Sequence, residues 1–434
     1  MSALRRKFRN RLPLRYGRLH WCAAMTCTVL GLAIAAYAAS GWTAPVTLAN
    51  PIPPADVLMS PVIAINSSGA QVAAWVSQDN DLMLQVAAQD SGGSWTSPQT
   101  LTPGSGVNAA DPSVAISPSG NAVAMWDVYS PPNLLVQASA RQAHGSWSAV
   151  TTLTSLANSS TLPKVGMDGS GNAVAIWLQS SSAGSSIETA NFPASGSWTA
   201  PVALSTPGVS AANPTLAVNT YSDAIAGWQT TNGQILVAER KAGVWGAPIS
   251  IAPAAFRQGA PHAALNDRGD AAVAWTGRGT ALVATRAAGG AWSAPITISK
   301  QSSGASARIA LDNYGNAIMT FSLVQYASGG YVYPVEAVTR PAGGSWGTPV
   351  LISGANDYAS SPNLVATPAG TFIAAWIDDN TYTARAAIRP IGQSAFGTPA
   401  VLSSSTGPLV LSAAPGHTAA TWIPPVQVSD AVTP

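Results

Sequence analysis

Cysteine is nearly absent from this chain of 434 residues. Its two copies, Cys22 and Cys27, both lie within the first 38 residues, so the rest of the chain has no thiol and no disulfide. Histidine is also scarce after residue 38, where His144, His262 and His417 are widely separated. A zinc site built from cysteine and histidine is therefore not expected, and we interpret His262 as an ordinary strand residue.

Charge is low, and its sign after the first 38 residues disfavours nucleic acid. Only 9% of the residues are charged, with 20 basic against 18 acidic side chains. Seven basic residues and no acidic ones lie in the first 38, which leaves 13 basic against 18 acidic residues and a net charge of −5. Because binding to a phosphate backbone needs excess positive charge, nucleic acid is not expected as a partner.

Familiar catalytic and helical patterns are missing as well. We find no Gly-x-Ser-x-Gly elbow at a strand-to-helix turn and no phosphate-cradling Gly-x-x-x-x-Gly-Lys loop. Helical periodicity is not found in the repeating units either, which excludes leucine-rich and helical solenoids. The common acyl-hydrolase and nucleotide-hydrolase sites are therefore not expected.

The first 38 residues differ in class from the rest. A basic segment from Arg5 to Arg18 precedes an apolar run from Trp21 to Ala39, and Ala36-Tyr37-Ala38 is an acceptable cleavage site. This pattern predicts an export signal and a secreted or periplasmic protein. The run Arg5-Arg6-Lys7-Phe8 partly matches a twin-arginine address. An uncleaved anchor is the alternative, and only through it would the protein contact a membrane.

What the sequence does contain is two interleaved series of aromatic residues, each with a period of about 50 positions. A fixed period of this length is typical of repeat architectures. In the first series, proline follows the aromatic residue by three positions in all copies but one; its members are Trp42, Trp95, Trp147, Trp198, Trp245, Trp292, Trp346 and Phe396. In the second series, glycine, or Ser222 in the fourth copy, precedes the aromatic residue by six positions; its members are Trp75, Trp126, Trp177, Trp228, Trp275, Phe321, Trp376 and Trp422.

The neighbours of each aromatic residue predict its place in a sheet. Proline cannot donate to a strand ladder, so the first series indicates an exposed edge strand. The glycine of the second series indicates a hairpin turn with positive φ. The strand that follows, such as Ala173-Val174-Ala175-Ile176-Trp177, is apolar on both faces and therefore fits between neighbouring sheets. We expect these rings to be buried between sheets, the alternative being exposed platforms for sugars.

Two further strand signals in each unit complete a four-stranded antiparallel meander, which is typical of a β-propeller blade. We predict an all-β, eight-bladed propeller over residues 39–434, with seven blades as the alternative. The last unit lacks a fourth strand after Val426-Gln427-Val428, and the segment from Trp42 to Leu48 lacks a sheet. We therefore expect the N-terminal strand to close the last blade, and the ring to be a monomer.

Carboxylates and tyrosines of predicted loops are the candidate ligand-binding residues. Most follow a second-series aromatic residue, in the expected loop between the second and third strands, which shares a face with the connections that carry Asp56, Asp111 and Asp357. Such oxygen-rich groups could bind calcium or orient sugar hydroxyls. A solvated acidic rim is the alternative, as is simple packing for the tyrosines. The candidates are Asp79, Asp81, Asp127, Tyr129, Tyr326, Tyr331, Asp378, Asp379 and Tyr382.

Two functions remain open. The first is a non-catalytic binding or scaffolding module for an extracellular glycan or protein, with the exposed tyrosines stacking on sugars. The second is a secreted glycoside hydrolase of sialidase-like type with an unrecognised site. Hydrolysis would need two carboxyl groups at a defined separation, which spacing along the chain cannot establish across blades.

The repeat from Pro112 to Trp126 and from Leu134 to Leu153 resembles the repeats of exported bacterial β-propeller proteins. It is also similar to sialidase-like propellers and to tryptophan-bearing propeller lectins, over Gly41 to about Val428. The resemblance implies blade structure. It does not carry sialidase activity, because the Ser-x-Asp-x-Gly-x-x-Trp box is absent and Phe256-Arg257-Gln258-Gly259 departs from Phe-Arg-x-Pro. WD repeats fit less well, since Trp126-Asp127 is the sole such dipeptide.

Overall fold

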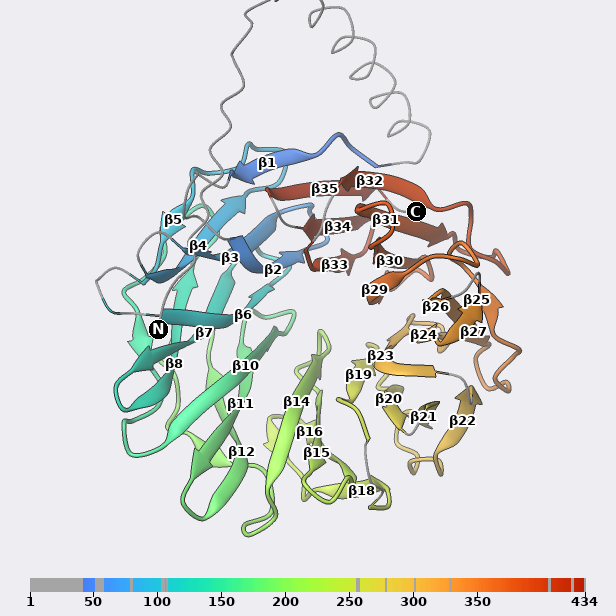
Figure 1. The fold of residues 1–434 in the computed structure, drawn as a ribbon. Helices are drawn as coiled ribbons and strands as arrows, with labels where there is room; N and C mark the ends of the chain where they lie inside the picture. Colours follow the sequence, from blue (N-terminus) through green and yellow to red (C-terminus); the bar gives the residue numbers. More distant parts are fainter. Residues whose placement is uncertain are drawn as a thin grey trace, which may run out of the picture.

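The computed structural model describes residues 42–50, 58–78, 81–102, 106, 108–254, 258–277, 279–299, 302–327, 330–404, 407–422 and 425–432. The predicted export signal, residues 1–38, lies outside them. The described residues form eight antiparallel sheets arranged in a ring, with the first strand of each sheet nearest the centre (Figure 1). The prediction of eight blades is confirmed.

The first four blades follow one another along the chain. Blade 4 has five strands, because β18 pairs with β16 beside the short β17. Blade 1 consists of β2 (Leu58–Ile65), β3 (Gln71–Gln78), β4 (Leu82–Gln89) and β5 (Gln99–Thr100); blade 2 of β6 (Asn108–Ile116), β7 (Ala122–Ser130), β8 (Asn133–Arg141) and β9 (Thr151–Thr152); blade 3 of β10 (Ser159–Met167), β11 (Ala173–Ser181), β12 (Gly184–Phe192) and β13 (Val202–Ala203); and blade 4 of β14 (Ala211–Val218), β15 (Ala224–Thr230), β16 (Ile235–Lys241), β17 (Val244–Trp245) and β18 (Ile249–Ala252).

The other four blades include the closure of the ring. Blade 6 carries an extra two-stranded hairpin, β25 and β26, between its second and third strands. Blade 5 consists of β19 (His262–Leu265), β20 (Ala271–Gly277), β21 (Thr280–Arg286) and β22 (Ile296–Ser299); blade 6 of β23 (Ser302–Leu311), β24 (Ala317–Leu323), β25 (Gln325–Ala327), β26 (Gly330–Val332), β27 (Val335–Arg340) and β28 (Val350–Leu351); blade 7 of β29 (Ala359–Ala366), β30 (Phe372–Asp378), β31 (Thr383–Arg389) and β32 (Ala400–Ser404); and blade 8 of β33 (Leu409–Ala414), β34 (His417–Trp422), β35 (Val426–Val432) and β1 (Val46–Ala49).

The N-terminal strand completes blade 8, as predicted. Strand β1 pairs antiparallel with β35, and Val46 lies opposite Val428. A bridge between Trp42 and Ala431 extends this pairing. The first and last strands of the chain therefore belong to one sheet, and no seam is left between blades 8 and 1.

The core consists of apolar clusters between successive blades. The second-series rings lie in them fully buried, whereas most first-series rings, on the outer strands, are only half-buried. Trp177, for example, packs with Val123 and Met125 of the preceding blade. The turn glycines before these rings all have positive φ, and Ser222 adopts φ 66° in the same place. Burial of the second series is thus confirmed.

Candidate functional site

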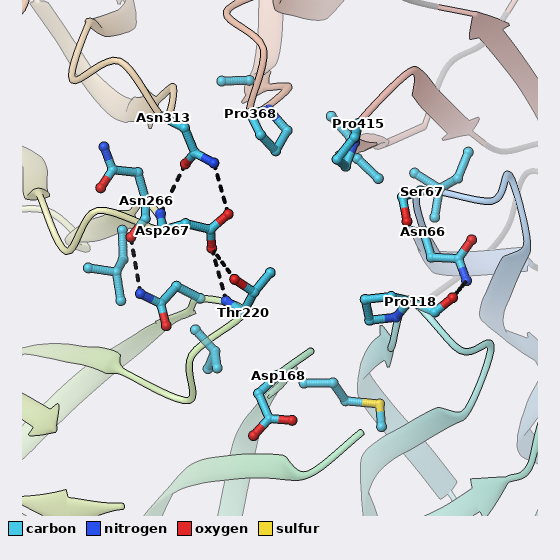
Figure 2. Close-up of a pocket in the computed structure, with 18 of the residues that line it drawn as sticks. Asn66, Ser67, Pro118, Asp168, Thr220, Asn266, Asp267, Asn313, Pro368 and Pro415 are labelled. Atoms are coloured by element: carbon cyan, nitrogen blue, oxygen red, sulfur yellow. Dashed lines mark hydrogen bonds between the residues drawn. The ribbon is translucent and has the colours of Figure 1, made fainter. Parts of the chain in front are cut away.

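At one end of the ring, the turns between the first and second strands surround a cavity of about 330 Å³ (Figure 2). In seven blades the first turn residue has a side-chain oxygen that accepts a backbone N–H four residues later, at 2.8–3.2 Å. These oxygens belong to Asn66, Ser117, Asp168, Asn219, Asn266, Asp312 and Thr367. The turn of the eighth blade, from Ala414 to His417, has no such oxygen at its start.

Polar side chains of this cavity also link neighbouring blades. Asn66 Nδ2 donates to the Ser117 carbonyl at 2.9 Å, and Asp267 Oδ1 accepts from Thr220 Oγ1 at 2.7 Å. Asp267 is bound on its other side by Asn313, whose Nδ2 donates to Asp267 Oδ2 at 2.9 Å (Figure 2). Because these polar groups hydrogen-bond to one another, we infer that this end of the ring mainly holds neighbouring blades together.

Toward the opposite end, the innermost strands are interrupted by a repeated bulge. The residue before a proline has positive φ in each of the first four blades: Ser60, Asp111, Leu162 and Asn213. Strand register shifts at the same points. A non-glycine residue in this conformation is strained, and bulges of this kind redirect side chains. Asp111, predicted in a connection between blades, therefore lies within β6.

The bulge places Asp111 beside the buried carboxyl of Asp127. Asp127 was predicted in a loop, but it belongs to β7 and is only 1% exposed. Its Oδ2 accepts the Leu162 N–H at 3.2 Å, and its side chain shares a hydrogen bond with the Asp111 carboxyl. Burial first, and the charge of Asp111 second, raise the pKa of Asp127 to about 7. The Asp127 carboxyl is therefore about half protonated near neutral pH.

Basic side chains complete the inner surface of the ring. Burial lowers the pKa of Lys164. The negative charges of Asp111 and Asp127 oppose this shift, and the positive charge of Arg308 adds to it. Burial, and next the charge of Arg308, lower the pKa of His262 to about 3, so its imidazole is neutral. The sequence interpretation of His262 as a strand residue is confirmed by its place in β19. Its neighbourhood was not foreseen, and neither Lys164 nor Arg308 was a candidate.

The other acidic candidates mainly shape their own loops. Asp81 Oδ2 accepts the Gly106 N–H at 3.0 Å, whereas Asp79 lies outside the described residues. Asp378 was predicted in a loop but ends β30, where it is buried, and its Oδ2 pairs with Arg385 at 3.0 Å. No group of three or more metal-ligating side chains occurs among the described residues. The acidic candidates within that part of the chain thus form no calcium cluster.

The two tyrosine candidates of blade 6 form a pair, and two tyrosines that we did not single out form a second pair nearby. Tyr326 and Tyr331 are 71% and 61% exposed and meet edge to face across the β25–β26 hairpin, with ring centroids 5.6 Å apart. Tyr333, just after this hairpin, contacts Tyr358 of blade 7 in the same manner at 4.5 Å. We call these four residues the tyrosine surface.

Backbone contacts join Tyr333 of blade 6 to Tyr358 of blade 7. A parallel bridge joins Tyr333 to Tyr358, and the Asp379 N–H donates to the Tyr358 carbonyl at 3.0 Å. The pKa of the Tyr358 phenol is raised, first by its hydrogen bond to the Tyr333 side chain. Tyr382 is exposed with φ 52° in the nearby loop of blade 7, whereas Tyr129 is an exposed residue of β7 in blade 2. Of the tyrosine candidates, Tyr326 and Tyr331 therefore contact each other, whereas Tyr382 and Tyr129 make no aromatic contact among the described residues.

No protein-family model and no curated protein matches this sequence. Among solved structures, the WD40 domain of SCAP from fission yeast is 11% identical, with a TM-score of 0.50, 91% of this chain covered and 98% of that one. The fold is therefore a β-propeller. A leech intramolecular trans-sialidase is also similar, at 10% identity, a TM-score of 0.42, and coverage of 76% and 65%. A protein of unknown function from Dyadobacter fermentans is 11% identical, with a TM-score of 0.44 and coverage of 69% and 98%.

The likeness to the WD40 domain confirms the predicted resemblance to propellers, and sialidases are among the similar structures. At such identities they describe the fold, which hosts many unrelated functions. Within the described part of the chain, no helix is long and apolar enough to cross a membrane. The predicted signal or anchor falls outside that part.

Proposed function

We propose that this protein is an exported binding module whose ligand is a glycan, held at the tyrosine surface of blades 6 and 7. The observation that carries this proposal is the placement of exposed, paired tyrosines on a hairpin inserted into a single blade. In repeat proteins, insertions in one unit commonly mark the binding face. Tyrosine offers a rigid apolar ring and a hydroxyl, which suits a ligand with both apolar and hydroxylated faces.

Neighbouring charge supports the same assignment. The carboxylate of Asp379 lies near the Tyr358 ring, close enough to raise the pKa of its phenol. A ring edge beside a carboxylate acceptor provides both stacking and hydrogen bonding to sugar hydroxyls. By contrast, Tyr221, in a turn of blade 4, is 72% exposed and has no aromatic partner among the described residues. The tyrosine surface is therefore distinct from ordinary exposed tyrosines.

Glycoside hydrolysis is the weaker proposal, for a geometric reason. The carboxyl groups of Asp111 and Asp127 are within hydrogen-bond distance of each other. Glycosidases hold their two carboxyl groups roughly 5–5.5 Å or 6.5–9.5 Å apart, so that the sugar or a water fits between them. Two carboxyl groups joined by a hydrogen bond leave no such space.

A glycan array probed with residues 39–434, followed by calorimetric titration of the best ligand, tests the proposal. We expect Tyr331→Ala and Tyr358→Ala each to weaken binding about tenfold or more, because truncating a central tyrosine contact costs on the order of 2 kcal/mol. Tyr221→Ala is the matched control and should bind as the unmodified protein does. A blank array, or equal binding by all three variants, would refute the proposal, and turnover of a glycoside would favour the hydrolase instead.

A further inference from the structure

The innermost strands place eight side chains at one level around the central axis. Each lies opposite the residue that precedes the buried second-series ring. Since all eight strands run in the same sense around the ring, this shared register defines a single layer. In blade order its members are Val62, Ser113, Lys164, Thr215, His262, Arg308, Asn363 and Val410.

Three members of this layer show how it is built. The Val165 N–H donates to Ser113 Oγ at 3.1 Å, and the Ala263 N–H donates to Thr215 Oγ1 at 3.2 Å. The Ile309 N–H likewise donates to His262 Nδ1 at 3.4 Å. Each bond joins a blade to the next one and satisfies an N–H on the inner edge of a sheet, where no further strand pairs. At these three of the eight positions, the occupant of the layer is therefore an acceptor.

Arg308 differs from these three residues, because it is a cation at an equivalent position of the layer. Among the described residues its guanidinium forms a single hydrogen bond, from Nη1 to the carbonyl of Ala307 at 3.3 Å, and no ion pair. Burial alone lowers its pKa, so no carboxylate of the described chain lies near enough to oppose that effect. Arg308 is half-buried, and a partly desolvated charge without a counter-charge is costly, which indicates that something else supplies the negative charge.

The neighbours of Arg308 in the layer are also donors. His262 accepts through Nδ1 and is neutral, so Nε2 carries the proton, and this N–H has no partner among the described residues. The Asn363 side-chain amide on the other side likewise has no described partner. Lys164 carries a further positive charge in the same layer, but Asp111 and Asp127 offset it. The uncompensated charge is therefore that of Arg308.

We propose that Arg308, flanked by the His262 Nε2–H and the Asn363 amide, binds an oxyanion, either the carboxylate or the phosphate group of a small ligand. The guanidinium suits this group because it can donate two parallel hydrogen bonds to a planar or tetrahedral oxyanion. This site lies on the inner strands of blades 5 to 7 and does not depend on the tyrosine surface.

Calorimetric titration with sodium phosphate and with sodium acetate, each against sodium chloride of matched ionic strength at pH 7, tests the site. We expect saturable binding of at least one oxyanion, weakened at least tenfold in Arg308→Gln. Arg268→Gln is the matched control, since Arg268 donates to the Tyr314 carbonyl at 2.8 Å in a turn at the other end of the blade. Thermal unfolding in chloride accompanies each titration, and there Arg308→Gln should be at least as stable as the unmodified protein.

The two anions distinguish the ligand chemistry. Binding of acetate alone assigns a carboxylate, binding of phosphate alone assigns a phosphate, and binding of both supports the shared site. No saturable binding, or equal binding by Arg308→Gln, overturns the proposal. A large loss of stability of Arg308→Gln in chloride also overturns it, because Arg308 would then be compensated within the protein. Tyr331→Ala should leave anion binding unchanged, which separates this site from glycan binding.

Discussion

The raised pKa of Asp127 makes this residue sensitive to pH near neutrality. Asp127 has a pKa of about 7 in the folded protein against 3.8 for the ordinary carboxyl. A raised pKa means that the protonated form favours folding. This stabilisation is fully present below about pH 4 and is lost as the pH rises through 7. The ionised pair, near Lys164 and the Leu162 N–H, is thus the less stable state.

We therefore predict that Asp127→Asn removes a pH dependence that the unmodified protein shows. Asparagine can still accept the Leu162 N–H, and its amide can donate to Asp111, so the contacts survive without a titrating proton. Urea unfolding between pH 4 and pH 8 should show the unmodified protein losing up to about 4 kcal/mol relative to the variant. Parallel stability curves for the two proteins would contradict this account.

Sequence reasoning at this scale found some site residues and misplaced others. Asp127 was a candidate because it follows Trp126, but its strand runs on past the expected loop and buries it. Lys164 and Arg308 carried no local signal, since a single charge in a short strand is also typical of a solvated face. Their importance depends on a shared register in blades three apart, and one sequence does not contain that relation.

At the scale of the strand, the second-series rings separate adjacent sheets where alanines elsewhere let them approach. Trp177 is fully buried, and Phe321 has the same place in blade 6 with the same burial. The position of the second-series aromatic residue therefore requires the volume of an aromatic side chain rather than an indole N–H.

We predict that Trp177→Ala costs about 3–5 kcal/mol of unfolding free energy, because it leaves a cavity between blades 2 and 3. Trp177→Phe is the matched control and should cost much less, as Phe321 indicates. Guanidinium unfolding of both variants measures the difference. If alanine and phenylalanine proved equally well tolerated, the ring would not be filling the space between these blades.

The elements themselves were predictable because their signals are local. A glycine six residues before each second-series aromatic marks the second strand, with Ser222 as the one exception. A proline three residues after each first-series aromatic marks the outer edge, with Val150 as the one exception. The bulges before Pro61, Pro112, Pro163 and Pro214 were not foreseen, since proline alone does not specify a positive φ at the residue before it. The β25–β26 hairpin was likewise hidden, because it is specific to one blade and has no repeat to reveal it.

At the scale of the whole molecule, the ring depends on contacts between residues nearly 390 positions apart. Thr43 Oγ1 donates to Asp430 Oδ1 at 2.6 Å, and Ser429 Oγ donates to the Thr43 carbonyl at 2.7 Å. Trp42 is 3% exposed and packs with Ile377 and Leu402 of blade 7. The segment from Trp42 to Ala49 therefore covers the outer edge of blade 8 and fills part of the core between blades 7 and 8.

We predict that a protein beginning at residue 50 loses the closure of blade 8, whereas one beginning at residue 39 keeps it. Losing Trp42 alone should cost about 3–5 kcal/mol, and the bare edge of β35 would be free to pair with another chain. Thermal unfolding and light scattering after size-exclusion chromatography should therefore show a lower melting temperature and self-association for the shorter protein only. A synthetic peptide of residues 42–49 should restore the monomer and raise the melting temperature, whereas a scrambled peptide should not. Equal stability of the two truncated proteins would mean that the ring holds together without this strand.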